Sequence, residues 1–106
     1  SAASNVTRGV FAGGSTADSS SGATNVISYI TIASTGNATD FGDLTVARQA
    51  LGVTSDGSRG VFGGGYHSGG TTVNVIDYIT ISSTGNATDF GDLTTSRLGV
   101  GATSGT

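Results

Sequence analysis

The sequence predicts an all-β protein built from repeated four-stranded antiparallel sheets. The chain has 106 residues, with 19 Gly and no Pro. Its Val, Ile, Phe and Tyr residues come in short blocks, which is typical of ordered strands and not of disordered linkers. Gly, Ser and Thr dominate and no apolar period of 3.6 residues is sustained, which disfavours helices. The third observation is a long internal repeat.

Residues 74–94 repeat residues 25–45 at an offset of 49, with 19 of 21 positions identical. The two differences are Ser28/Asp77 and Ala33/Ser82. Such self-similarity at a period near 50 residues indicates a repeat architecture.

Each repeat unit is predicted to contain four strands joined by hairpins. A small-residue strand, 50–55, leads into the strand 59–65. Asp56-Gly57 is a strong signal for a tight two-residue hairpin turn between them. A polar loop precedes the long strand 74–81, and the short segment 88–94 closes the unit. The corresponding segments of the first unit are 8–14, 25–32 and 39–45.

Both faces of the long strand 74–81 are apolar. Because alternate residues of a strand point to opposite sides, Val75, Ile79 and Ile81 face one way and the neighbouring Ile76 and Tyr78 the other. Apolar faces on both sides of a sheet must both be covered. Radial stacking of four-stranded sheets, the β-propeller, covers each face with another blade.

The order of these segments resembles the kelch repeat, over nearly all of the chain. The matching marks are a Gly-Gly pair after the second strand, an aromatic residue in the third and an Arg after the fourth: Gly13-Gly14 and Gly64-Gly65, Tyr29 and Tyr78, Arg48 and Arg97. Kelch units usually carry a Trp in the fourth strand, where this chain has Phe41 and Phe90. The Gly-rich and Thr-rich composition also resembles kelch-like stretches of bacteriophage and environmental proteins, or a symmetrised or designed fragment of one. The resemblance implies protein or glycan binding through loops.

We therefore expect one repeat domain, 1–106, that self-assembles as a homo-oligomer. Strands two to four of blade 1 are placed in 8–48, and blade 2 in 49–97. Two blades cannot close a ring, and their open faces would form an association surface. Identical chains in head-to-tail contact close a ring if the rotation divides a full turn. A homotrimer with six blades is the first choice, a homotetramer with eight the second, and five chains are less favoured.

Residues 98–106 are expected to form an inner strand that completes blade 1 of a neighbouring subunit. This assembly strand consists of Gly99, Val100, Gly101, Ala102, Thr103 and Ser104. The alternative is that Ser1–Ser4 supplies the inner strand.

Two sets of polar residues have a functional and a structural interpretation. The repeated pairs Asp40/Asp43 and Asp89/Asp92 would suit Ca²⁺, but carboxylates that cap turns and protect an edge strand are the favoured interpretation. The four Arg residues would suit an anionic ligand, but pairing with Asp of the same or the next blade is favoured.

The candidate ligand-contacting loop is Tyr66, His67 and Ser68, because binding residues concentrate on loops held by rigid scaffolds. His67 is the only His, and no set of nucleophile, base and orienting group can be assigned around it. We therefore expect no catalytic activity, cofactor or metal. The kelch-like family includes oxidases, but their metal ligands include Cys, which this chain lacks.

The composition limits the partners further. A net charge of −3 with four scattered Arg argues against nucleic acid and anionic membranes, which both need clustered cations. The alternative function is a β-solenoid-like adhesin or ice-binding surface with arrays of Thr31, Thr35, Thr80 and Thr84. Solenoid coils are shorter than a period of about 50 residues, which favours the propeller.

Overall fold

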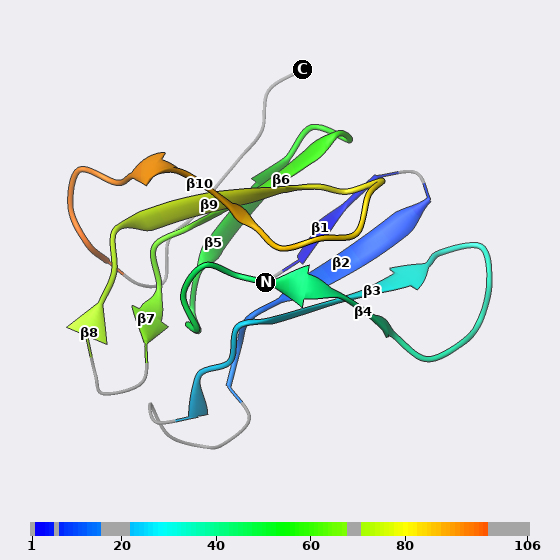
Figure 1. Ribbon diagram of the computed structural model, residues 1–106, viewed down its shortest axis with the longest axis horizontal. Coiled ribbons are helices and arrows are strands. Elements are labelled where there is room, and N and C mark those ends of the chain that lie inside the picture. Colours follow the sequence, from blue (N-terminus) through cyan, green and yellow to red (C-terminus); the bar gives the residue numbers. More distant parts are fainter. Residues whose placement is uncertain (1, 6, 16–21, 68–70, 98–106) are drawn as a thin grey trace.

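The computed structural model describes residues 2–5, 7–15, 22–67 and 71–97. The secondary-structure elements assigned in these ranges, β1 to β10, are all strands. Eight strands form two four-stranded antiparallel sheets, and two short strands form a separate hairpin (Figure 1). This confirms the predicted all-β class with antiparallel sheets. Within the described ranges, no helix is long and apolar enough to cross a membrane.

The two sheets have the same meander topology, in which strands adjacent in the chain pair with each other. Sheet 1 contains β1 (Ala2–Ser4), β2 (Arg8–Ala12), β3 (Val26–Thr31) and β4 (Thr39–Asp43) in this order. Sheet 2 contains β5 (Gly52–Ser55), β6 (Arg59–Gly63), β9 (Val75–Thr80) and β10 (Thr88–Asp92) in this order. The separate hairpin pairs β7 (Tyr66–His67) with β8 (Thr71–Thr72).

The inner strand of sheet 1 comes from the same chain. In β1, Ala3 is paired with Val10 of β2, which is the register that Thr54 and Val61 have in sheet 2. This differs from the expectation that a neighbouring subunit completes blade 1, and agrees with the alternative in which the first residues do so. The assembly strand predicted at 99–104 lies outside the described residues.

The hairpin turns that lead into β2 and β6 use the same side-chain device. Asp56 Oδ1 accepts hydrogen bonds from the backbone N–H groups of Ser58 and Arg59, both at 2.9 Å. Asn5 Oδ1 accepts equivalent bonds from Thr7 and Arg8, at 2.8 and 2.7 Å. Asp and Asn side chains stabilise turns in this way by bonding the backbone two residues on. A turn is therefore present where the sequence predicted one, but it covers residues 56–58 and not Asp56-Gly57 alone.

Each sheet has two faces that differ in sequence. We call the face that carries the tyrosine the front face, and the other the back face. The front face holds Val10, Ile27, Tyr29 and Phe41 in sheet 1, and Val61, Ile76, Tyr78 and Phe90 in sheet 2. The back face holds Phe11, Ser28, Ile30 and Ile32 in sheet 1, and Phe62, Asp77, Ile79 and Ile81 in sheet 2.

The core of the molecule lies between the front face of sheet 1 and the back face of sheet 2. From sheet 1 it contains Ala3, Val10, Ala12, Ile27 and Phe41; from sheet 2 it contains Phe62, Ile79 and Ile81; and Leu44 and Leu51 come from the connecting segments. The inner strands also meet, because β1 contacts both β5 and β6. The two sheets are thus stacked front to back, not front to front.

Candidate assembly interface

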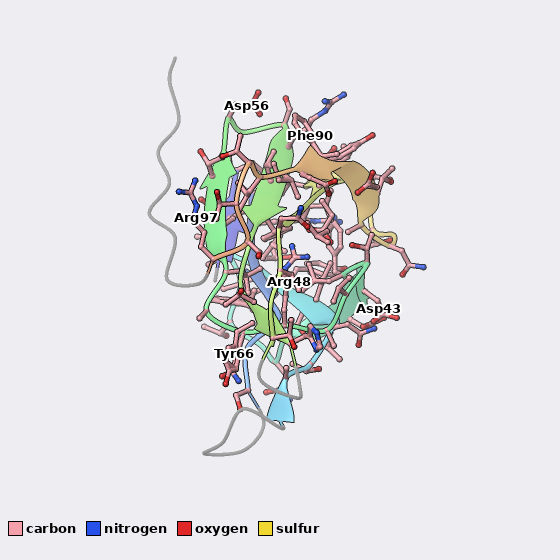
Figure 2. All side chains as sticks on the ribbon, turned by 90° about the vertical axis from the view of Figure 1, so that its left-hand side faces the viewer. Asp43, Arg48, Asp56, Tyr66, Phe90 and Arg97 are labelled. Atoms are coloured by element: carbon pink, nitrogen blue, oxygen red, sulfur yellow. The ribbon has the colours of Figure 1, made fainter. Side chains whose placement is uncertain are left out.

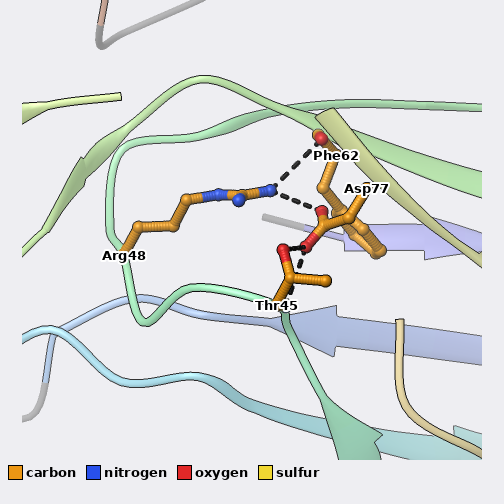
Figure 3. Close-up of polar contacts among 4 residues, drawn as sticks. All are labelled: Thr45, Arg48, Phe62 and Asp77. Atoms are coloured by element: carbon orange, nitrogen blue, oxygen red, sulfur yellow. Dashed lines mark hydrogen bonds and ion pairs between the residues drawn. The ribbon is translucent and has the colours of Figure 1, made fainter. Parts of the chain in front are cut away.

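A buried ion pair ties the two sheets together. Arg48 follows β4, and its side chain is fully buried with that of Asp77 from β9 (Figure 3). Arg48 Nη2 donates to Asp77 Oδ1 at 2.5 Å and to the carbonyl oxygen of Phe62 at 3.2 Å. Thr45 donates to Asp77 Oδ2 through both its backbone N–H (3.0 Å) and its hydroxyl (2.8 Å). The prediction that Arg residues pair with Asp of the same or the next blade is confirmed for Arg48.

Backbone groups also form hydrogen bonds at the outer edge of the sheets, across the contact between sheet 1 and sheet 2, which we call the junction. The N–H groups of Gly85 and Ala87, in the β9–β10 connection, donate at 2.8 Å to the carbonyl oxygens of Phe41 and Asp43. The N–H of Asp43 donates in turn to Asn86 Oδ1 at 3.0 Å. The β9–β10 connection of sheet 2 therefore lies along β4 of sheet 1.

Gly42 is required at this edge because the backbones come very close. A Cβ atom on Gly42 would clash with the backbone of Gly85, its carbonyl oxygen above all. Its repeat equivalent in sheet 2, Gly91, has open space within 4 Å of that position. Gly42 is crowded by sheet 2, whereas Gly91 lies on the outer front face.

Aromatic residues show the same contrast between the junction and the outer faces. Phe62, on the back face of sheet 2, is 0% exposed, while its repeat equivalent Phe11 on the back face of sheet 1 is 49% exposed. Phe41, on the front face of sheet 1, is 3% exposed, while its equivalent Phe90 is 55% exposed. The other large hydrophobic residues that are exposed, Val26 and Ile32, also lie on the back face of sheet 1. The two outer faces are therefore uncovered copies of the two faces that meet in the core.

The outer front face already has the side-chain arrangement of the buried one. Tyr29 and Phe41 meet edge to face with ring centroids 5.8 Å apart, and Tyr78 and Phe90 do so at 5.9 Å. The guanidinium carbon of Arg8 lies 4.5 Å from the centroid of the Tyr29 ring, and Arg59 and Tyr78 repeat this contact at 4.9 Å. Edge-to-face aromatic pairs and cation–π contacts are favourable in themselves. The side chains of the outer front face of sheet 2 therefore already have the arrangement that they have in the buried contact.

The two arginines that follow the fourth strands have opposite environments. Figure 2 shows Arg48 near the middle of the molecule and Arg97, its repeat equivalent, at the edge. Arg48 is buried and Arg97 is exposed. An exposed guanidinium is hydrated by water, whereas the buried guanidinium of Arg48 depends on a protein partner.

The acidic residues considered for Ca²⁺ lie on the outer strands of the two sheets. Asp40, Asp43, Asp89 and Asp92 are all exposed, in β4 and β10. Among the described residues, no three acidic or histidine side chains come together as a metal site would require. Asp43 takes part in the junction through its backbone, as described above.

Two of the three residues of the candidate ligand loop lie in the hairpin β7–β8. Tyr66 and His67 are half-buried, and the backbone of Tyr66 exchanges two hydrogen bonds with Gln49, at 2.9 and 3.0 Å. Ser68, the third residue, lies outside the described part of the chain. The hairpin is therefore anchored to the segment that connects the two sheets.

The repeated threonines of the alternative interpretation line two shallow hollows. Thr31 and Thr35 line one of about 250 Å³ beside β3, and Thr80 and Thr84 line one of about 370 Å³ beside β9. Phe41 of sheet 1 also lines the second hollow. Both hollows are open and combine hydroxyl groups with one or two aromatic rings.

Comparison with known proteins adds no family to this description. No protein-family model matches the chain, and no match is found among the curated proteins.

Proposed function

We propose that this chain is a structural and binding module whose sheets stack with those of further copies as blades of a kelch-like β-propeller. The observation that carries the proposal is the match between inner and outer faces. Phe11 and Phe90 are exposed, whereas the same residues of the other repeat are buried where the two sheets meet. A second copy that places its back face on the front face of sheet 2 would repeat a contact that the chain already makes within itself.

The contact between copies would be heterologous, because the two surfaces that meet are different. Such contacts generate a ring when the rotation per subunit divides a full turn, and an open filament when it does not. Three chains would give six blades, which remains the first choice, and four chains would give eight. Both numbers lie in the range of known propellers.

In the proposed assembly, copies associate by stacking their outer sheet faces and do not exchange strands. The inner position of sheet 1 is filled by β1 of the same chain. Each copy can therefore fold its own two sheets before it meets another, and association adds burial of the outer faces.

Binding of a protein or glycan would use the parts that stacking leaves free. The hairpin β7–β8, which carries Tyr66 and His67, lies beyond the ends of the sheet 2 strands (Figure 1). We assign no catalytic role to these residues.

The experiment uses one variant at each open face. Phe11→Asp damages the outer back face and Phe90→Asp damages the outer front face. Each variant alone would lose association by roughly a hundredfold or more, since a charge placed in a packed apolar contact is costly. An equimolar mixture would form dimers, because the intact front face of one variant meets the intact back face of the other.

Native mass spectrometry and sedimentation velocity measure these states. The unmodified chain is expected as a trimer, each variant as a monomer, and the mixture as a heterodimer. Thr71→Asp, an exposed residue in β8 away from both faces, is the matched control and should assemble normally. A folded monomer of the unmodified chain, or a mixture that stays monomeric, would refute the proposal.

A further inference from the structure

The junction inside the chain contains a complete receptor for a carboxylate. Asp77 supplies that carboxylate, and it is bound by Arg48 Nη2 and by the backbone N–H and hydroxyl of Thr45. Arg48 is fully buried, and its Nε and Nη1 atoms have no hydrogen-bond partner among the described residues. This buried guanidinium therefore depends on Asp77 for its counter-charge.

The second repeat contains equivalents of the two residues that bind the carboxylate, whereas the first repeat has no carboxylate at the position equivalent to Asp77. Arg97 and Thr94, which follow β10, are the equivalents of Arg48 and Thr45, and both are exposed. The equivalent of Asp77 on the outer back face is Ser28. This is one of only two differences in the 21-residue repeat, and it falls at the one position that holds the counter-charge.

We propose that the junction between two copies binds a small monovalent anion, such as chloride, at the place that the Asp77 carboxylate occupies inside the chain. The anion would be held by Arg97 and Thr94 of one copy and by Ser28 of the next. Burying a guanidinium with no counter-charge is costly. The serine hydroxyl oxygen takes the place of the aspartate Cγ, so serine leaves free the space of both carboxylate oxygens. This inference rests on the proposed stacking of copies and adds a ligand to it.

Another acidic residue near this place is Asp40, which is paired across the strands with Ser28. Its equivalent, Asp89, is paired in the same way with Asp77. Asp89 is exposed, and the ion pair of Arg48 is with Asp77. In the repeated geometry Asp40 takes the place of Asp89, on the same face as the residue with which it is paired. Because Arg48 forms its ion pair with Asp77 and not with Asp89, the proposal leaves the counter-charge of Arg97 to a free anion.

The test compares association of the unmodified chain in sodium chloride and in sodium gluconate, at equal ionic strength and pH. Sedimentation velocity over a range of protein concentrations gives the association constant in each salt. We expect association in chloride to be tighter by about tenfold or more, the effect of one charge-assisted contact. A site that replaces a single side-chain carboxylate would admit a chloride ion but would not enclose the six-carbon chain of gluconate.

Ser28→Asp is the decisive variant, because it builds the counter-charge into the chain. It should associate at least as tightly in gluconate as the unmodified chain does in chloride, with no difference between the salts. Ser28→Asn has the same shape without the charge, and it should associate more weakly in both salts.

Three results would overturn the inference. Equal association of the unmodified chain in the two salts, with loss of assembly in Asp40→Asn, would assign the counter-charge to Asp40. A preference for chloride that persists in Ser28→Asp would be a general salt effect. Both results leave the proposed stacking intact, whereas an unmodified chain that stays monomeric in either salt would refute the stacking itself.

Discussion

Arg48 and Asp77 are the charged residues buried in the described part of the chain. A buried ion pair is not by itself stabilising, because removal of two charges from water offsets most of their attraction. Its effect is on specificity: the front face of sheet 1 carries an arginine, and the back face of sheet 2 carries the carboxylate that accepts it. This pair therefore favours one order of stacking over the others.

Asp77→Ala should lower the free energy of unfolding by about 3–5 kcal/mol, because it leaves the guanidinium of Arg48 buried without a counter-charge. Urea unfolding followed by circular dichroism measures the change. The double variant Arg48→Met/Asp77→Leu should recover most of the loss, since it removes both charges. A cost below about 1 kcal/mol for Asp77→Ala would show that the pair is solvated.

Asp56 gives the β5–β6 hairpin a dependence on acid. Backbone hydrogen bonds from Arg59 and then Ser58 lower the pKa of its carboxyl below its ordinary value of 3.8. A lowered pKa in the folded state means that the contribution to stability is present above the unfolded pKa and is lost as the pH falls through the folded pKa. The hairpin should therefore loosen below about pH 4, the region of an ordinary Asp pKa.

Amide chemical shifts of residues 55–60, followed by NMR during an acid titration, measure this loosening. Asp56→Asn should remove the pH dependence, because Asn5 makes the same two bonds in the β1–β2 hairpin without a titrating group. A transition that persists in Asp56→Asn would assign it to another group.

At the scale of elements, the close approach of β4 to the β9–β10 connection depends on Gly42. Gly42→Ala should destabilise the monomeric chain by about 1–3 kcal/mol, the usual cost of forcing an added group into a packed contact. Gly91→Ala is the matched control, with nearly the same φ angle, +155° against +156°, and open space around it.

The difference between these two variants isolates the contact between sheets. Thermal unfolding of both, under conditions that keep the chain monomeric, gives that difference. Gly91→Ala should instead weaken association between copies, since Gly91 would meet the β3–β4 connection of the next chain. Equal unfolding temperatures for the two variants would contradict the role of Gly42.

Most strands could be predicted from the sequence because their apolar residues alternate or cluster and their turns carry Gly, Asp or Asn. The sequence instead predicts the inner strand of sheet 1 from a neighbouring subunit, since Ser1–Ser4 is a poor match to the small-residue strand 50–55. The signal that would have placed it is Asn5, which stands three residues before Arg8 as Asp56 stands three before Arg59. The hairpin β7–β8 lies in the segment that the sequence predicts as a polar loop, and its two strands have only two residues each.

The sequence predicts that Arg residues pair with Asp residues, but it does not predict which two residues form the buried ion pair. Arg48 and Asp77 are 29 positions apart and meet only because sheet 1 stacks front to back on sheet 2. The Ser28/Asp77 difference marks Asp77 as a special position within the repeat. The sequence does not identify Arg48 as its partner, because that depends on how the two sheets are stacked. The contrast between buried and exposed repeats has the same origin, because identical residues acquire different environments by position alone.

At the scale of the whole molecule, stacking that turns by a constant angle produces either a finite or an unlimited assembly. If the contact closes, the mass of the assembly should reach that of a trimer or tetramer and stay there as the protein concentration rises. Light scattering coupled to size-exclusion chromatography measures this plateau. A mass that grows continuously with concentration would indicate an open filament and refute the closed ring.

The hairpin that carries Tyr66 and His67 has its sequence only in the second of the two repeats, since the first has Ser15-Thr16 at that place. A closed assembly would therefore display it once per chain, at equal angles around its rim. A partner with several arms would engage these hairpins together, and its avidity would exceed the strength of any single contact. A monovalent fragment of the same partner would be held only weakly.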